Sequence, residues 1–161
     1  MKKIILSEKV ENSKEKYDAV ISNIEIVNEL HDHFFIDDDI HYDSLCSYFV
    51  DVMDEVVSFE GFKAFLFKTR NKAHIKDYVV SGLKKMNLNQ YLTIFEKYLS
   101  MITIYEGKDI YELEGNVDTS FHQLDEEYRQ LGSKELEYTN ADFLLNHPDT
   151  IFLDKKQRLN Y

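Results

Sequence analysis

Three histidines and five aspartates lie between residues 31 and 43, and these residue types commonly bind transition metals. Their spacing argues against a metal site. His31 and His33 face different sides of a helix, and no His-x-x-x-His or Glu-x-x-His pair is present. The run from Asp37 to Asp39 lacks the alternation and the glycine of a calcium loop. We therefore predict a solvated polar turn and no bound metal, and a small metal-dependent hydrolase using His31 to Asp43 remains a third alternative.

The serines, glycines and cysteine show none of the contexts that support catalysis. No serine lies in a nucleophile elbow, Glu60-Gly61-Phe62 is not a phosphate loop, and no carboxylate pair is set apart from solvent. The single cysteine, Cys46, has apolar neighbours and is predicted to be a buried small hydrophobe. The sequence therefore favours a protein that is not an enzyme and needs no cofactor.

Acidic residues are segregated along the chain, which has a net charge of −11. Residues 1–60 contain 15 carboxylates and five lysines, whereas residues 61–95 contain seven basic residues and the single acid Asp77. A surface that is mostly negative attracts cationic partners and repels nucleic acid and anionic membranes. We expect a basic protein partner, with no direct binding of nucleic acid and no membrane association.

Length and composition favour one folded domain over residues 1–161. A hydrophobic content of 43% supports a packed core, and a chain of 161 residues can bury about 68–70% of its unfolded surface. The chain has only five glycines and one proline, which are the residues that most often form hairpin turns, while apolar residues recur at steps of three and four. The prediction is an all-α bundle of about six to seven helices. A short apolar run at the N-terminus and a lone cysteine favour the cytoplasm.

The first two predicted helices carry acids on one side. Ser13 is predicted to cap a helix that runs to about Phe34, and its acids recur at steps of four and three, opposite the apolar residues. A second helix over about residues 42–60 repeats the arrangement. If the two helices pack antiparallel, both acidic stripes and the turn between them form one anionic face. The predicted partner-binding acids are Glu11, Glu15, Asp18, Glu25, Glu29, Asp32, Asp37, Asp38, Asp39, Asp43, Asp51, Asp54 and Glu55. A simpler alternative stays open, in which these acids form the solvent-exposed side of amphipathic helices and bind no partner.

Other residues predict where the later helices begin and end. Asn87 is predicted to cap the helix over residues 88–102, which ends near residues 106–108. Gly132 is predicted to close one helix, and the next must stop before Pro148. The basic middle segment is predicted to complement the acidic segments, within the monomer or across a homodimer interface. Its residues are Lys63, Lys68, Arg70, Lys72, Lys76, Lys84 and Lys85.

The segment from Tyr48 to Leu66 resembles the core signature of a bacterial DNA-mimic protein family. That signature contains a tyrosine, a short helix, a valine, two asparagines, two glycines, a phenylalanine and a glutamine-phenylalanine pair. Val57 matches the valine, Gly61 the second glycine, and Phe62 and Phe65 the aromatic positions. The residues at positions 58–60 depart from the signature, which makes this a divergent member. The resemblance covers about residues 40–145.

The resemblance implies an all-helical dimer whose acidic surface imitates duplex DNA and occupies the DNA-binding face of a transcription factor or similar basic protein. The motif residues have structural roles in this interpretation. Gly61 would permit a tight turn between helices, and Phe62 and Phe65 would pack beneath it. The full set is Tyr48, Val57, Gly61, Phe62 and Phe65. A rival hypothesis is an immunity-type or antitoxin-like protein that neutralises a basic toxin without resembling DNA.

Overall fold

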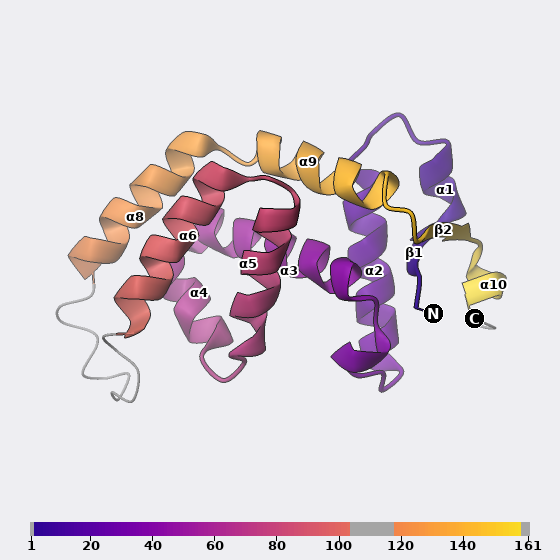
Figure 1. Cartoon of the computed structure of the whole chain (residues 1–161), viewed down its shortest axis with the longest axis horizontal. Helices are drawn as coiled ribbons and strands as arrows, with labels where there is room; N and C mark the ends of the chain where they lie inside the picture. Colours follow the sequence, from indigo (N-terminus) through magenta and orange to yellow (C-terminus); the bar gives the residue numbers. More distant parts are fainter. Residues whose placement is uncertain (1, 104–117, 159–161) are drawn as a thin grey trace. The chain divides into compact units, whose positions relative to one another are not determined.

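The computed structural model describes residues 2–103 and 118–158, which form two compact units (Figure 1). Unit 1 combines Met1–Asp51 with Lys134–Tyr161, and unit 2 is Val52–Ser133. The structure is 74% helical, which confirms the all-α prediction, and a short parallel sheet of two strands accompanies the helices. That the whole chain acts as one domain stays a prediction. None of the described helices is long and apolar enough to cross a membrane.

A parallel pair of strands lies in unit 1. β1 (Ile4–Ser7) pairs with β2 (Thr150–Leu153), with Ile4 opposite Thr150. Ile4 and Leu6 are fully buried while the alternate residues of β1 are partly exposed, as the period of two in a strand requires. No local sequence pattern predicts this sheet, because its strands are far apart in the chain and parallel, so no hairpin turn marks them.

The core of unit 1 forms where helices pack beside β1. α1 (Glu8–Glu11), α2 (Asp18–Asp32) and α9 (Lys134–Leu145) supply apolar residues to it, and α10 (Lys155–Arg158) follows β2. The buried residues of this cluster are Ile4, Leu6, Val10, Ala19, Val20, Ala141 and Leu144. The cluster therefore joins the two ends of the chain.

The predicted first helix begins later than expected, at Asp18. The Ser13 hydroxyl accepts the Glu15 N–H and donates to the Asp18 carboxylate. These bonds stabilise a local turn, which competes with helix, so the prediction that Ser13 caps the long helix is wrong. α2 ends in a Schellman motif, in which the Phe35 N–H bonds to the Leu30 carbonyl and Phe34 has φ 67°.

A short connection joins α2 to the next helix. A 3-10 turn, η1 (Asp37–Asp39), precedes α3 (Tyr42–Glu60), which begins in unit 1 and ends in unit 2. His41 Nδ1 accepts the Asp43 N–H at 3.1 Å and so caps the start of α3. Within unit 1, the buried Asn23 side chain and Ser44 exchange two hydrogen bonds, which fix α2 against α3.

Gly61 forms the turn between α3 and α4 (Phe62–Thr69) in unit 2, with φ 88°. The Phe62 N–H donates to Asp125 Oδ1 at 2.7 Å, so Asp125 caps α4 from another helix. Phe62 and Phe65 are fully buried and contact Tyr98 at ring-centroid distances of 5.0 and 5.9 Å. The turn and the aromatic packing agree with the structural roles expected for these motif residues.

Among its described residues, unit 2 also contains the helices α5 (His74–Lys85), α6 (Asn89–Ile102) and α8 (Asp118–Leu131). The Asn87 prediction is wrong, because Asn87 has φ 57° and closes α5 in a second Schellman motif. Gly132 follows α8 with φ 69°, and α9 ends at Leu145, before Pro148, as predicted. The predicted helix end at residues 106–108 lies outside the described residues.

Candidate functional site

The predicted acids divide into exposed, half-buried and buried sets. The exposed set is Glu11, Glu15, Glu25, Asp32, Asp38, Asp39 and Glu55. The half-buried set is Asp18, Glu29, Asp37 and Asp43, and the buried set is Asp51 and Asp54. One continuous stripe from Glu11 to Asp32 does not form, because α1 and the turn at Ser13 separate Glu11 and Glu15 from α2.

The predicted acidic stripe on α3 is wrong. Asp51 is 7% exposed and accepts the Tyr17 hydroxyl at 2.7 Å within unit 1. Asp54 is 6% exposed and accepts the Tyr128 hydroxyl at 2.6 Å within unit 2. A buried carboxylate requires such partners, since burial without a hydrogen bond is costly. These two aspartates therefore stabilise the fold and are not available to a partner.

Asp43 also faces inward, into a cluster of charged and polar side chains in unit 1. Asp43 Oδ2 lies 3.0 Å from His147 Nε2, and His41 Nε2 lies 3.7 Å from Asp149 Oδ2. Lys3 Nζ contacts the other oxygen of Asp149 at 2.6 Å. The hydrogen bond from Lys3 is the main reason that the pKa of Asp149 is lowered, and burial lowers the pKa of His41.

Among the described residues, His41, His147 and Asp149 place one potential ligand atom each within 4.8 Å of one another. The hydrogen bonds of the two rings do not fit a metal site. Nδ1 of His41 accepts the Asp43 N–H, and Nδ1 of His147 accepts the Asp149 N–H. In the neutral rings Nε2 must then carry the proton and point it toward carboxylates, whereas a metal-bound histidine donates its second ring N–H. The cluster fits a hydrogen-bonded network of neutral histidines and carboxylates, with one ion pair between Lys3 and Asp149.

The other two histidines of the predicted metal cluster make separate contacts. His31 Nε2 lies 3.1 Å from Asp37 Oδ1, and His33 Nδ1 lies 2.7 Å from the Glu29 carbonyl oxygen. Within the described parts of the chain, neither histidine joins His41 in a group with metal-ligand geometry. The hydrolase alternative therefore has no support from the arrangement of these side chains.

Three exposed apolar side chains lie beside the exposed acids at the end of α2. Phe34 is 93% exposed, Ile36 62% and Phe35 47%. We call residues 32–39 the acidic–apolar turn. The spacing of Phe34 continues the apolar side of α2, a pattern that would place its ring in the core. The helix in fact ends at Asp32, and Phe34 then adopts a left-handed conformation that aromatic residues rarely adopt.

The acids of the acidic–apolar turn differ in their freedom to meet a partner. Asp37 pairs with His31, and the Asp39 carboxylate accepts the Ile36 N–H at 3.3 Å. Asp32 and Asp38 are exposed and form no ion pair with any described residue, and the same holds for Glu25. Glu25 lies seven residues before Asp32, which places both on the exposed side of α2. Glu11, Glu15 and Glu55 are also exposed and form no ion pair with any described residue. Glu25, Asp32 and Asp38 differ from them in lying on α2 and the acidic–apolar turn, on either side of Phe34 in sequence.

The comparison with family models gives one match. The model described as "DMP19-like protein" matches residues 38–147. No curated protein and no solved structure matches the chain. The match begins within η1 and includes α3 and the Gly61 turn, whereas β1, α1, α2, β2 and α10 lie outside it.

Proposed function

The chain belongs to the DMP19-like family, a family of DNA mimics, and we propose that it is a non-enzymatic binding protein that occupies the DNA-binding surface of a basic protein such as a transcription factor. Its exposed carboxylates would stand in for phosphates. The observation that carries this proposal is the exposure of Glu25, Asp32 and Asp38 without an ion pair to any described residue. Unpaired acids on an already negative protein add repulsion without stabilising the fold, and we propose that those beside the exposed Phe34 bind the partner.

Phe34 adds an apolar contact to this surface. A fully exposed aromatic ring in a left-handed conformation costs stability and returns none through burial. Aromatic side chains are common anchors at the centres of protein interfaces. We propose that Phe34 packs against the partner while Asp32 and Asp38 meet its basic side chains.

One observation favours the antitoxin-like alternative. The exposed acids of unit 1 that lie nearest Phe34 in sequence belong to one turn and one helix, not to two merged helical stripes. A toxin inhibitor needs one patch fitted to one site, while a DNA mimic needs charges spaced over a duplex-sized surface. Competition by duplex DNA separates the two functions, because only a DNA-binding partner will be released by it.

The proposed partner surface is tested with two triple variants. The first is Glu25→Gln, Asp32→Asn and Asp38→Asn. The matched control, Asp77→Asn, Glu96→Gln and Glu135→Gln, removes the same charge from other exposed acids. The partner is captured from a nuclease-treated host lysate, and the affinity of each variant for it is measured over a salt series.

We expect the first triple to weaken binding at least tenfold, about 1.4 kcal/mol, and the control less than twofold. Binding of the wild-type protein should fall steeply with salt, because exposed charges are screened over about 8 Å at physiological ionic strength. Equal losses from both triples would show that net charge, not arrangement, governs binding. An affinity that does not change with salt would remove the electrostatic proposal.

We also propose that the protein is a homodimer, as the resemblance implies. Within unit 2, Lys68 of the basic segment pairs with Glu60, while Arg70, Lys72 and Lys84 are exposed. These exposed cations are available to acidic residues of a second copy. Light scattering at micromolar concentration tests this, and a mass near 19.1 kDa at every concentration would contradict it.

A further inference from the structure

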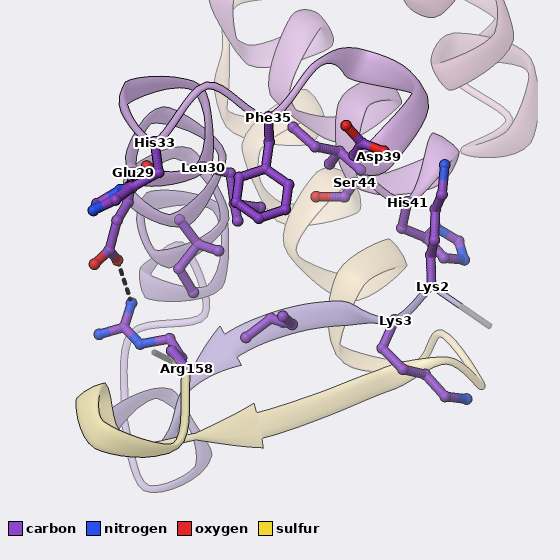
Figure 2. Close-up of a pocket in the computed structure, with 13 residues that line it drawn as sticks. Lys2, Lys3, Glu29, Leu30, His33, Phe35, Asp39, His41, Ser44 and Arg158 are labelled. Atoms are coloured by element: carbon purple, nitrogen blue, oxygen red, sulfur yellow. Dashed lines mark hydrogen bonds and ion pairs between the residues drawn. The ribbon is translucent and has the colours of Figure 1, made fainter. Parts of the chain in front are cut away.

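A pocket of about 440 Å³ lies in unit 1, between β1, α2 and the connection to α3 (Figure 2). Its walls are largely apolar, with Ile5 from β1, Ile26 and Leu30 from α2, and Phe35 and Ile40 from the connection. The volume falls within the range of about 300–1,000 Å³ that is typical of small-molecule sites. An apolar hollow of this size suits the body of a small organic ligand.

The charge of the lining is opposite in sign to that of the protein. The lining includes the cations Lys2, Lys3 and Arg158 and the acids Glu29 and Asp39, a balance of one positive charge in a chain of net charge −11. Figure 2 shows Arg158 beside Glu29 at one end of the pocket, with Lys2 and Lys3 at the other. Lys3 pairs with Asp149 and Arg158 with Glu29, so Lys2 is the lining cation that has no ion pair with a described residue. One such cation favours a monoanion, and the two acids disfavour a ligand with several negative charges.

Arg158 has hydrogen-bonding capacity that the described residues do not use. Its Nη1 lies 3.4 Å from Glu29 Oε2, but its Nε is buried and has no hydrogen-bond partner among the described residues. A buried donor normally has a partner, and a guanidinium edge matches the two oxygens of a carboxylate. Lys2 is exposed at the pocket and forms no ion pair with any described residue.

We propose that this pocket binds a small carboxylic acid with an apolar body. The carboxylate accepts hydrogen bonds from Arg158, and the apolar body lies against Ile5, Leu30 and Phe35. Most of the lining belongs to residues 2–35 and to Arg158, which lie outside the family match to residues 38–147. The site therefore does not depend on the proposed competition with DNA.

Octanoate and its uncharged analogue octan-1-ol test this proposal. Binding of each to the full chain is measured by NMR shifts of the unit 1 amides up to about 1 mM. We expect saturable binding of octanoate at least tenfold tighter than that of octan-1-ol, and loss of this difference in Arg158→Gln. Phe35→Ala should weaken both ligands, and Lys14→Gln, which removes an exposed cation outside the pocket, should change neither.

The outcomes that overturn the proposal are specific. Absence of saturable octanoate binding by about 1 mM, or equal affinities for the two ligands, would show that the pocket does not select a carboxylate. If Arg158→Gln does not fold, Lys2→Gln and Phe35→Ala replace it, because both side chains are exposed. If both variants bind octanoate as tightly as the wild type does, octanoate binds outside this pocket.

Discussion

Replacement of Gly61 by alanine should strongly destabilise unit 2, for two reasons. Gly61 has φ 88°, where a side chain costs about 1–2 kcal/mol. A Cβ added there would also lie 2.5 Å from Asp125 Oδ2, so Asp125 must move and release the Phe62 N–H that it now accepts at 2.7 Å. Loss of that hydrogen bond adds about 1–2 kcal/mol. The expected total is about 2–4 kcal/mol.

A double-mutant cycle with Asp125→Ala tests this reasoning. Asp125→Ala alone loses the cap of α4 and should cost about 1–2 kcal/mol. In the double variant the carboxylate is already absent, so the alanine at position 61 adds only the backbone strain. The two single costs should exceed the double cost by about 1–2 kcal/mol. Urea unfolding followed by near-UV tyrosine signals measures each variant, since Tyr91, Tyr98 and Tyr128 are buried in unit 2. Strictly additive costs would refute the proposed shared contact.

Two further changes test His41, at the start of α3, and Phe34, within the acidic–apolar turn. Burial lowers the pKa of His41 below its ordinary 6.5, so its contribution to stability is present above pH 6.5 and is lost as the pH falls toward the folded-state value. His41→Asn keeps an acceptor for the Asp43 N–H, so the loss of unfolding free energy between pH 7.5 and pH 5.5 should be smaller in this variant than in the wild type. His41→Ala removes the acceptor and should lower the unfolding free energy by about 0.5–2 kcal/mol at both pH values. Equal pH dependence in the wild type and His41→Asn would contradict the assignment to His41. Phe34→Gly relieves a strained backbone and removes almost no buried surface, so the free energy of unfolding, measured by thermal denaturation, should rise by about 1 kcal/mol. The affinity for the partner should fall, and an unchanged affinity would show that Phe34 is not an anchor.

The helices were predictable because their signals are local. The apolar residues of α6 recur over four turns, and Gly132 and Pro148 mark helix ends through backbone geometry that depends on one residue. The late start of α2 and the role of Asn87 were missed, since short polar side chains serve several turn types and only the neighbouring packing selects one.

The acids of α3 were misplaced for a different reason. Periodicity assigns a carboxylate to the solvent-exposed side of a helix. Asp51, however, accepts a hydrogen bond from a tyrosine 34 positions before it, and Asp54 accepts one from a tyrosine 74 positions after it. No local pattern contains such partners. The same limit applies to the pocket, whose lining joins Lys2 and Arg158 from opposite ends of the chain.

The position of the family match gives the two triple variants a further use. Glu25 and Asp32 lie outside residues 38–147 and Asp38 lies at the first matched position, whereas Asp77, Glu96 and Glu135 all lie within the match. If the matched helices carry the binding surface, the control triple should weaken binding more than the first triple does. That outcome would move the partner surface away from the acidic–apolar turn and into the family region. A loss confined to the first triple would mean that this chain presents its binding acids mainly from a helix that the family model does not include.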